Sequence, residues 1–440
     1  MLWPSVSGCA SDLLDSPEGR ISVRRCTNAR GDQAIAFSFR AIRIRCIDAN
    51  NAQRFLVRIH RPTAGVAVSE PLLVHWTEAG QACSARWRSE WGSPAPTRVA
   101  LATDKMTADT AYRLACEGSA LLWQGDFQNA RQLLNAMARR VDRHPPKPGS
   151  SPAESFHLHR QGQSLRARVL GMLLVALEGD YEVRLPRAPD LRLACTEAYG
   201  PADGRALVSL RELLGLIGAH EWRKKGLVIP AIGGRIYPHY GVFSPVRSEY
   251  VGLVAETPLP SQTRAFDIGT GTGVLAAILA KRGVAHIVAT DHDPRALACA
   301  RENLAKLGLT AKVDVVQADL FPEGRASLVV CNPPWIPARP SSPIEHAIYD
   351  SESRMLRGFL NGLAAHLEPG GEGWLLLSNL AEHLGLRTRE ELLAAVATAG
   401  LRVIGKISVR PTHPRASDPT DPLSAARAAE LTTLWRLGVL

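Results

Sequence analysis

Four consecutive residues, Asn332-Pro333-Pro334-Trp335, follow directly on an apolar stretch, 326–331, that is typical of a buried strand. The two prolines fix φ and carry no backbone N–H group, so they can hold the Asn332 amide and their own carbonyl groups in one rigid geometry. These oxygens can accept hydrogen bonds from a planar NH2 group and aim its lone pair at an electrophile. Trp335 adds a flat face against which a base or an amide can stack. The tetrapeptide therefore predicts four catalytic residues, although a strand-ending turn is the alternative when it is taken alone.

A glycine-rich turn at residues 269–273, Gly-Thr-Gly-Thr-Gly, joins another predicted strand, 264–268, to a helix. Glycines let the backbone turn sharply and let a ligand approach without a Cβ in the way, and the helix N-terminus offers free N–H groups. The dinucleotide fingerprint G-x-G-x-x-G would place its last glycine at Val274. No Gly-Lys-Ser/Thr follows, which excludes a phosphate loop. The spacing therefore favours a nucleoside ligand of another kind.

Two carboxylates follow the next two predicted strands. Asp291 ends the strand 286–290, 22 residues after Gly269, and Asp319 comes after the strand 312–316. A carboxylate at Asp291 can accept both ribose hydroxyls of an adenosine, and Asp319 is placed to meet the adenine amine. Taken alone, Asp291 could instead cap a turn. With the glycine loop, these residues predict an adenosine site.

The stretch 267–273, Asp-Ile-Gly-Thr-Gly-Thr-Gly, resembles the cofactor loop of class I S-adenosylmethionine-dependent methyltransferases. The resemblance implies an enzyme with S-adenosyl-L-methionine as its cofactor. It also implies that Asp267 lies near the methionine part and that Asp291 takes the ribose. The loop residues expected beneath the cofactor are Gly269, Thr270, Gly271 and Gly273.

Residues 332–335 resemble the Asn/Asp-Pro-Pro-aromatic signature of amino methyltransferases, which modify adenine N6, guanine N2 or a glutamine amide. Together with residues 241–249, Gly-Val-Phe-Ser-Pro-Val-Arg-Ser-Glu, they are most similar to release-factor glutamine methyltransferases and related "small" methyltransferase domains. The resemblance covers about residues 226–410 and implies methyl transfer to a glutamine amide of a release-factor-like protein. In that family a Pro-Arg-x-x-Glu stretch precedes the core, whereas here the order is Pro-Val-Arg-Ser-Glu, and tryptophan is the less usual aromatic.

Two alternatives stay open. The acceptor could be an adenine N6 or guanine N2 of rRNA, tRNA or DNA, because residues 1–240 hold 32 Lys and Arg against 22 Asp and Glu, whereas residues 241–440 hold 20 of each. A basic half predicts contact with nucleic acid or ribosomes. Arginine outnumbers lysine by 44 to 8, so compositional bias is another source of this charge. The protein could also be a non-catalytic scaffold that binds the cofactor.

A chain of 440 residues is long enough for two or three domains. Residues 226–440 read as an α/β catalytic domain with a seven-stranded, Rossmann-like sheet, preceded by a β-hairpin at 227–237. Residues 101–225 read as a mainly helical accessory domain for substrate recognition, with a proline-rich linker near 144–152. Residues 1–100 read as a partly β region, so the N-terminal part as a whole is α+β.

The expected strands of the catalytic sheet are 264–268, 286–290, 312–316, 326–331, 373–378, 402–408 and 431–436. The expected helices are 127–140, 153–177, 206–219, 273–283, 294–307, 353–366 and 388–399, and another begins near 107. The last strand follows a loop without a clear crossover helix and is therefore expected to enter antiparallel.

The eight cysteines stand singly, with no Cys-x-x-Cys pair, so no metal site is expected. The longest apolar run, 169–177, is far shorter than the ~20 residues that a bilayer requires. The N-terminus has no basic segment followed by a long apolar core, as a signal peptide would. We therefore expect a cytoplasmic protein with no membrane contact.

Overall fold

The structure, a computed structural model, describes residues 9–16, 19–27, 33–39, 42–43, 72–246, 249–340, 343–412 and 421–440. The chain divides into two compact units, Met1–Ser69 and Glu70–Leu440. In the first unit, the described residues form an antiparallel sheet in the order β1-β2-β3-β4. Its strands are β1 (Cys9–Ser16), β2 (Gly19–Thr27), β3 (Gln33–Phe39) and β4 (Ile42–Arg43).

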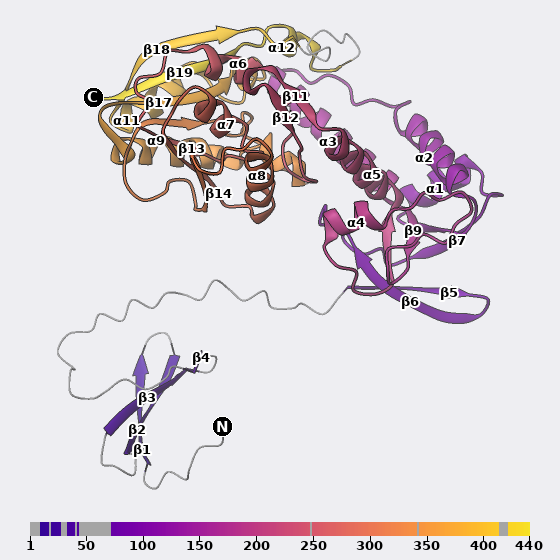
Figure 1. The fold of residues 1–440 in the computed structure, drawn as a ribbon. Coiled ribbons are helices and arrows are strands. Elements are labelled where there is room, and N and C mark those ends of the chain that lie inside the picture. Colours follow the sequence, from indigo (N-terminus) through magenta and orange to yellow (C-terminus); the bar gives the residue numbers. More distant parts are fainter. Residues whose placement is uncertain are drawn as a thin grey trace. The chain divides into compact units, whose positions relative to one another are not determined.

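The second unit contains a seven-stranded sheet in the order β15-β14-β13-β16-β17-β19-β18 (Figure 1). Its strands are β13 (Arg264–Ile268), β14 (His286–Asp291), β15 (Val313–Gln317), β16 (Ala326–Cys331), β17 (Leu367–Ser378), β18 (Leu401–Val409) and β19 (Thr432–Val439). Neighbouring strands from β15 to β17 are parallel, whereas β19 is antiparallel to both β17 and β18. The structure thus confirms the predicted α/β fold with an antiparallel last strand.

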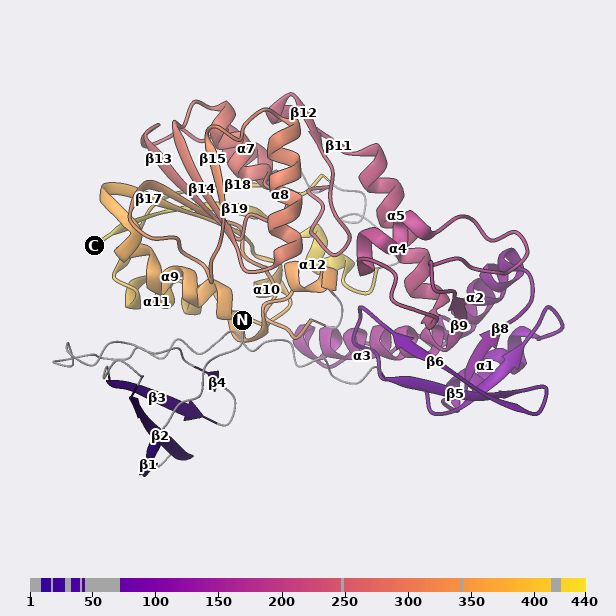
Figure 2. The same cartoon turned by 60° about the horizontal axis from the view of Figure 1, so that its bottom comes forward.

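Helices cover both faces of this sheet (Figures 1 and 2). They are α6 (Glu249–Glu256), α7 (Val274–Lys281) and α8 (Pro294–Lys306) on one face, and α9 (Arg354–His366) and α11 (Arg389–Thr398) on the other. Shorter elements are the helices α10 (Leu380–His383) and α12 (Ser424–Ala428) and the 3-10 turns η3 (Pro343–Ala347) and η4 (Ser351–Ser353). Because side chains alternate along a strand, Leu328 and Val330 of β16 pack under α7, whereas Val329 and Cys331 pack under α9. Burial on both sides explains why these strands are almost continuously apolar.

A second, six-stranded sheet precedes the first in the chain, in the order β5-β6-β10-β9-β8-β7. Its strands are β5 (Leu73–Glu78), β6 (Gln81–Arg88), β7 (Val99–Ala102), β8 (Ala120–Trp123), β9 (Leu173–Leu177) and β10 (Ala206–Ser209). The helices of this region are α1 (Ala108–Cys116), α2 (Phe127–Val141), α3 (Pro152–Gly171), α4 (Arg192–Tyr199) and α5 (Leu210–Lys225). The proline-rich segment lies between α2 and α3, as expected.

Two helix predictions in this region were wrong in extent. The helix expected over 153–177 ends at Gly171, since residues 173–177 form β9, and the helix expected over 206–219 begins only at Leu210, after β10. Both strands are short runs of buried, mostly apolar residues, which periodicity alone cannot distinguish from a buried stretch of helix. The region predicted as mainly helical therefore also contains a central sheet.

A short antiparallel hairpin of β11 (Leu227–Ile229) and β12 (Gly234–Ile236) links α5 to the catalytic sheet, as the sequence predicts. A 3-10 turn, η2 (Pro230–Ile232), lies between the two strands, and Gly233 follows it with a φ of 61°. None of the helices in the described parts of the chain is long and apolar enough to span a membrane.

Candidate active site

The sheet brings the two predicted motifs to the same edge. Ile268, the last residue of β13, pairs with Cys331 of β16 on one side and with Thr290 of β14 on the other. Gly269 and Asn332 therefore leave the sheet side by side from adjacent parallel strands. Open α/β sheets bind their ligands at this carboxyl edge.

The three glycines of the loop all have positive φ, of 71° at Gly269, 55° at Gly271 and 81° at Gly273. A Cβ on Gly273 would lie 3.3 Å from the backbone of Ala300, so this glycine lets α7 pack closely on α8. A Cβ on Gly271 would meet no atom within 4 Å. The open space at Gly271 fits a cofactor that passes directly over the loop backbone.

Asp267 braces the loop from inside. Its side chain is buried, and its Oδ2 accepts hydrogen bonds from the Thr270 hydroxyl at 2.7 Å and from the Ala276 N–H at 3.0 Å. Burial raises the pKa of Asp267 to about 6, against the two hydrogen bonds, which lower it. The hydrogen bond between Thr270 and Asp267 thus helps to fix the conformation of the loop.

Asp291 faces the loop from β14. Its Oδ2 accepts a hydrogen bond from the Gly271 N–H at 3.0 Å, and its Oδ1 accepts one from the Asp293 N–H, also at 3.0 Å. A carboxylate has about four acceptor sites, so Asp291 can still accept ribose hydroxyls. Asp319, by contrast, has a side chain that is 76% exposed and forms an ion pair with Arg354 at 3.3 Å. The structure joins Asp291 to the glycine loop and shows no such contact for Asp319.

The Asn332 side chain is held within its own motif. The indole N–H of Trp335 donates a hydrogen bond to Asn332 Oδ1 at 2.9 Å. Pro333 is buried, and Pro334 is half-buried. Ile336, the next residue, forms a parallel bridge with Tyr349, so the tetrapeptide is anchored at both ends. The arrangement can present the amide oxygen of Asn332 to an incoming N–H group.

Residues 350–355 support the site in a way that the sequence interpretation missed. The buried Asp350 accepts hydrogen bonds from the N–H groups of Met355 and Leu356, at 3.1 Å each, and so caps the start of α9. A Cβ on Gly269 would lie 2.5 Å from the Met355 methyl carbon, so this side chain covers the start of the loop. An aspartate shortly before an amphipathic helix was the available signal.

The accessory region contacts the site through α3. Phe156, a residue of this helix, is buried in one apolar cluster with Ile336. Arg160 bonds both oxygens of Glu345 at 3.0 Å, and its guanidinium lies over the Tyr349 ring at 4.1 Å. Because 185 residues separate Arg160 from Glu345, no local pattern could reveal this contact.

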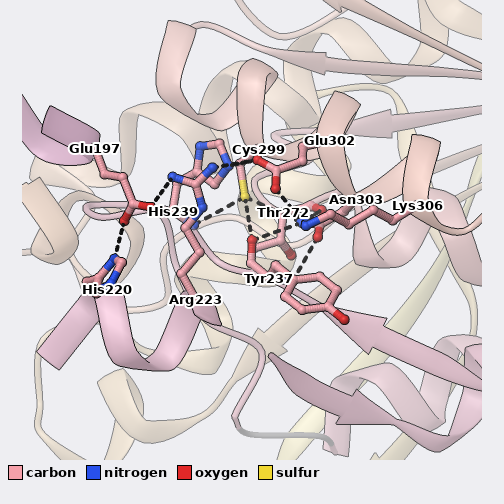
Figure 3. A network of polar contacts seen from close by, with 10 residues as sticks. All are labelled: Glu197, His220, Arg223, Tyr237, His239, Thr272, Cys299, Glu302, Asn303 and Lys306. Atoms are coloured by element: carbon pink, nitrogen blue, oxygen red, sulfur yellow. Dashed lines mark hydrogen bonds and ion pairs between the residues drawn. The ribbon is translucent and has the colours of Figure 1, made fainter. Parts of the chain in front are cut away.

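A second contact with the accessory region centres on Glu302 of α8 (Figure 3). Its carboxylate binds Arg223 of α5 at 2.7 Å, His239 Nε2 at 2.6 Å and Lys306 at 2.8 Å. Burial alone would raise the pKa of Glu302, but its bonds to Lys306, His239 and Arg223 outweigh burial and lower the pKa to about 2. A stable carboxylate therefore joins α5 to α8.

The neighbouring Asn303 carries this contact to the glycine loop (Figure 3). Asn303 is fully buried; its Nδ2 donates to the Thr272 carbonyl at 3.1 Å, and its Oδ1 accepts from the Tyr237 N–H at 2.8 Å. One side chain thus ties the loop to the segment that follows the hairpin. Within the described residues, no group of three or more His, Cys, Asp or Glu could hold a metal ion.

The part of the chain that carries this site is similar in sequence to known methyltransferases. Residues 234–396 match the family model of the methyltransferase small domain. A release factor glutamine methyltransferase of Cereibacter sphaeroides is 33% identical over 180 residues, which cover 38% of this chain and 61% of that protein. A ribosomal protein L11 methyltransferase of Pelotomaculum thermopropionicum is 48% identical over 69 residues, or 15% of this chain and 22% of that protein. A tRNA1(Val) (adenine(37)-N6)-methyltransferase of Bacteroides fragilis is 38% identical over 96 residues, or 20% of this chain and 40% of that protein.

The sheet topology and the glycine loop define a class I S-adenosylmethionine-dependent methyltransferase domain. Residues 234–396 match the methyltransferase small domain, and the chain is similar to release factor glutamine methyltransferases. The chain spans 61% or less of the length of these three relatives.

Proposed function

We propose that this protein transfers the methyl group of S-adenosylmethionine to a planar NH2 nitrogen, and that this nitrogen is a glutamine amide of a release-factor-like protein. The observation that carries the proposal is the pairing of Ile268 with Cys331, which puts the glycine loop and Asn332 at adjacent strand ends. An electrophile over the loop and a nitrogen held by Asn332 would then be neighbours.

Some residues of the chain would bind the cofactor, and others would position the acceptor nitrogen. Asp291 would accept the ribose hydroxyls, and Gly271 leaves room for the nucleoside. When bound, the cofactor would supply a methyl group on a sulfonium sulfur, and the sulfur is a good leaving group because it departs as a neutral thioether. Asn332 Oδ1 and the Pro333 carbonyl would accept the two N–H groups of the acceptor and direct its lone pair along the line of attack. Positioning of this kind provides most of the reduction in the barrier, and the surplus proton passes to water.

Support for a protein acceptor comes from the release factor glutamine methyltransferase that is 33% identical over 180 residues. The accessory region, which we assign to residues 101–225, would recognise the acceptor. Its helix α3 packs against the segment that follows Asn332-Pro-Pro-Trp335. An acceptor bound to α3 would therefore lie next to the reacting groups.

A nucleic-acid acceptor is the second candidate. It is favoured by the excess of positive charge in residues 1–240 and by the similarity to a tRNA adenine-N6 methyltransferase. Such charge attracts phosphates whatever the base sequence. In this case Trp335 would stack on a base.

The test is an acceptor screen with tritium-labelled S-adenosylmethionine. The full chain is incubated separately with purified release factor, ribosomal protein L11 and bulk tRNA, and the Asn332→Ala variant serves as the control for background labelling. We expect label in the release factor, which peptide mass spectrometry should place on a glutamine. Label in tRNA alone would establish the second candidate. Cofactor binding by calorimetry without label in any acceptor would leave the non-catalytic scaffold.

A further inference from the structure

We propose that Trp335 is a positioning residue whose indole N–H fixes the orientation of the Asn332 amide. The inference deepens the proposed function and rests on it, because the amide oriented in this way is the one that would receive the acceptor nitrogen. This role differs from stacking, because stacking uses the face of the indole ring, whereas the hydrogen bond uses the N–H group at its edge.

Only Trp335 can be the donor of this hydrogen bond. The indole Nε1 of Trp335 lies 2.9 Å from Asn332 Oδ1, and an indole can donate a hydrogen bond but cannot accept one. If the amide turned by 180°, its NH2 group would face the indole N–H, and the bond would be lost. Loss of one ordinary hydrogen bond disfavours a state by about tenfold, so the bonded orientation dominates. The amide oxygen keeps a second lone pair for the N–H of an acceptor.

Trp335 is itself held in place. Its side chain packs against two apolar clusters, one of which includes Phe359 of α9 and the other Ile336 next to α3. Its backbone carbonyl lies 3.5 Å from Nη2 of Arg387, whose side chain is almost fully buried. Because the ring is fixed, the hydrogen bond that it donates also fixes the orientation of the Asn332 amide.

This role requires tryptophan rather than another aromatic residue. Phenylalanine would keep a flat face but has no donor, and the hydroxyl of tyrosine lies at the far end of its ring rather than at the edge where Nε1 lies. The less usual aromatic of the signature therefore supplies a hydrogen bond that phenylalanine or tyrosine could not make here. Trp335→Phe separates the two roles of the ring.

The first experiment reads the hydrogen bond directly and needs neither cofactor nor acceptor. The full chain is labelled with 15N at the tryptophan indoles, and the Trp335 resonance is assigned by its loss in Trp335→Phe. Asn332→Ala should move the Trp335 indole proton upfield, because a bonded proton is deshielded. Trp374 is the internal control, since its indole donates to the buried Glu372 at 2.9 Å and should not move. An unmoved Trp335 resonance in Asn332→Ala would overturn the proposal.

The second experiment separates positioning from stacking. With the acceptor that is labelled in the screen, Trp335→Phe should lower kcat about tenfold, as expected for one lost positioning bond, and leave the KM for the acceptor within about twofold. Trp87→Phe is the matched control: Trp87 lies in β6, outside the region assigned to acceptor recognition, and its indole N–H also donates a hydrogen bond, to the Ser93 carbonyl at 2.7 Å, so its replacement should change neither constant. An unchanged kcat, or a higher KM with unchanged kcat, would show that the ring only stacks. Absence of any labelled acceptor refutes the proposed function, whereas the resonance experiment still decides the orientation of the amide.

Discussion

Replacing Asp267 by asparagine tests how much stability the protein loses when the buried Asp267 carboxyl is charged. Asp267 is only 1% exposed, and a single oxygen accepts both of its hydrogen bonds, from the Thr270 hydroxyl and the Ala276 N–H. Asparagine can present its own oxygen to the same two donors. Asp267→Asn therefore removes the charge and keeps the bonds, which isolates the electrostatic contribution to the free energy of unfolding.

The size of the effect follows from the pKa. Burial raises the pKa of Asp267 from its usual 3.8 to about 6, so the folded protein holds this proton more tightly than the unfolded chain. The stabilisation is fully present below the unfolded pKa and is lost as the pH rises through the folded pKa. The total is about 3 kcal/mol, of which about 2 kcal/mol falls between about pH 4.5 and pH 7.5.

The assay is urea unfolding, followed by tryptophan fluorescence, of both proteins at a series of pH values. The free energy of unfolding of Asp267→Asn, relative to that of the wild type, should increase by about 2 kcal/mol between about pH 4.5 and pH 7.5. Thr270→Val is the control: it keeps the charge but removes a bond that lowers the pKa, so its stability should fall more steeply with pH than that of the wild type. Parallel pH profiles for the wild type and Asp267→Asn would refute the reasoning.

Three further predictions concern the proposed site. Asn332→Ala should raise the barrier to methyl transfer by roughly 2–4 kcal/mol and leave cofactor affinity, measured by calorimetry, unchanged; unchanged turnover counts against the site. Asp291→Ala should weaken cofactor binding about tenfold or more through lost hydrogen bonds, and an unaltered dissociation constant would remove Asp291 from the pocket. Gly271→Ala should cost only about 1 kcal/mol of stability from its positive φ but should block cofactor binding. Gly273→Ala should lower Tm further, because its Cβ would meet Ala300. Similar cofactor affinity in Gly271→Ala and the wild type would argue against a ligand over Gly271.

The catalytic sheet could be predicted from the sequence because parallel strands buried on both faces are apolar runs between clear turn signals. The strand at 326–331 was placed correctly at both ends. The strand β17, by contrast, begins at Leu367 rather than 373, because Leu367 and Glu372 also pair with β16, on either side of an irregularity in register. The strand β9 was missed because an apolar run that follows a helix after one residue reads as more helix. Local pattern thus fails where no turn residue marks the boundary.

The spacing of the glycine loop and of Asn332-Pro-Pro-Trp335 predicted which residues leave the sheet at one edge. It could not predict what holds them there, because those contacts join distant parts of the chain. The bond between Asn332 and Trp335 was equally hidden, since a sequence pattern says nothing of which side-chain edges meet. The residues that position the site therefore had to come from the structure.

The accessory region supports both halves of the site at once. Through α5, Arg223 binds Glu302, and the adjacent Asn303 holds the glycine loop from behind. Through α3, Arg160 binds Glu345 in the segment that follows Trp335. Both ion pairs are only partly exposed to solvent, which screens them less than pairs on the open surface. A macromolecule that binds this region would therefore act on the glycine loop and on the segment after Trp335 together.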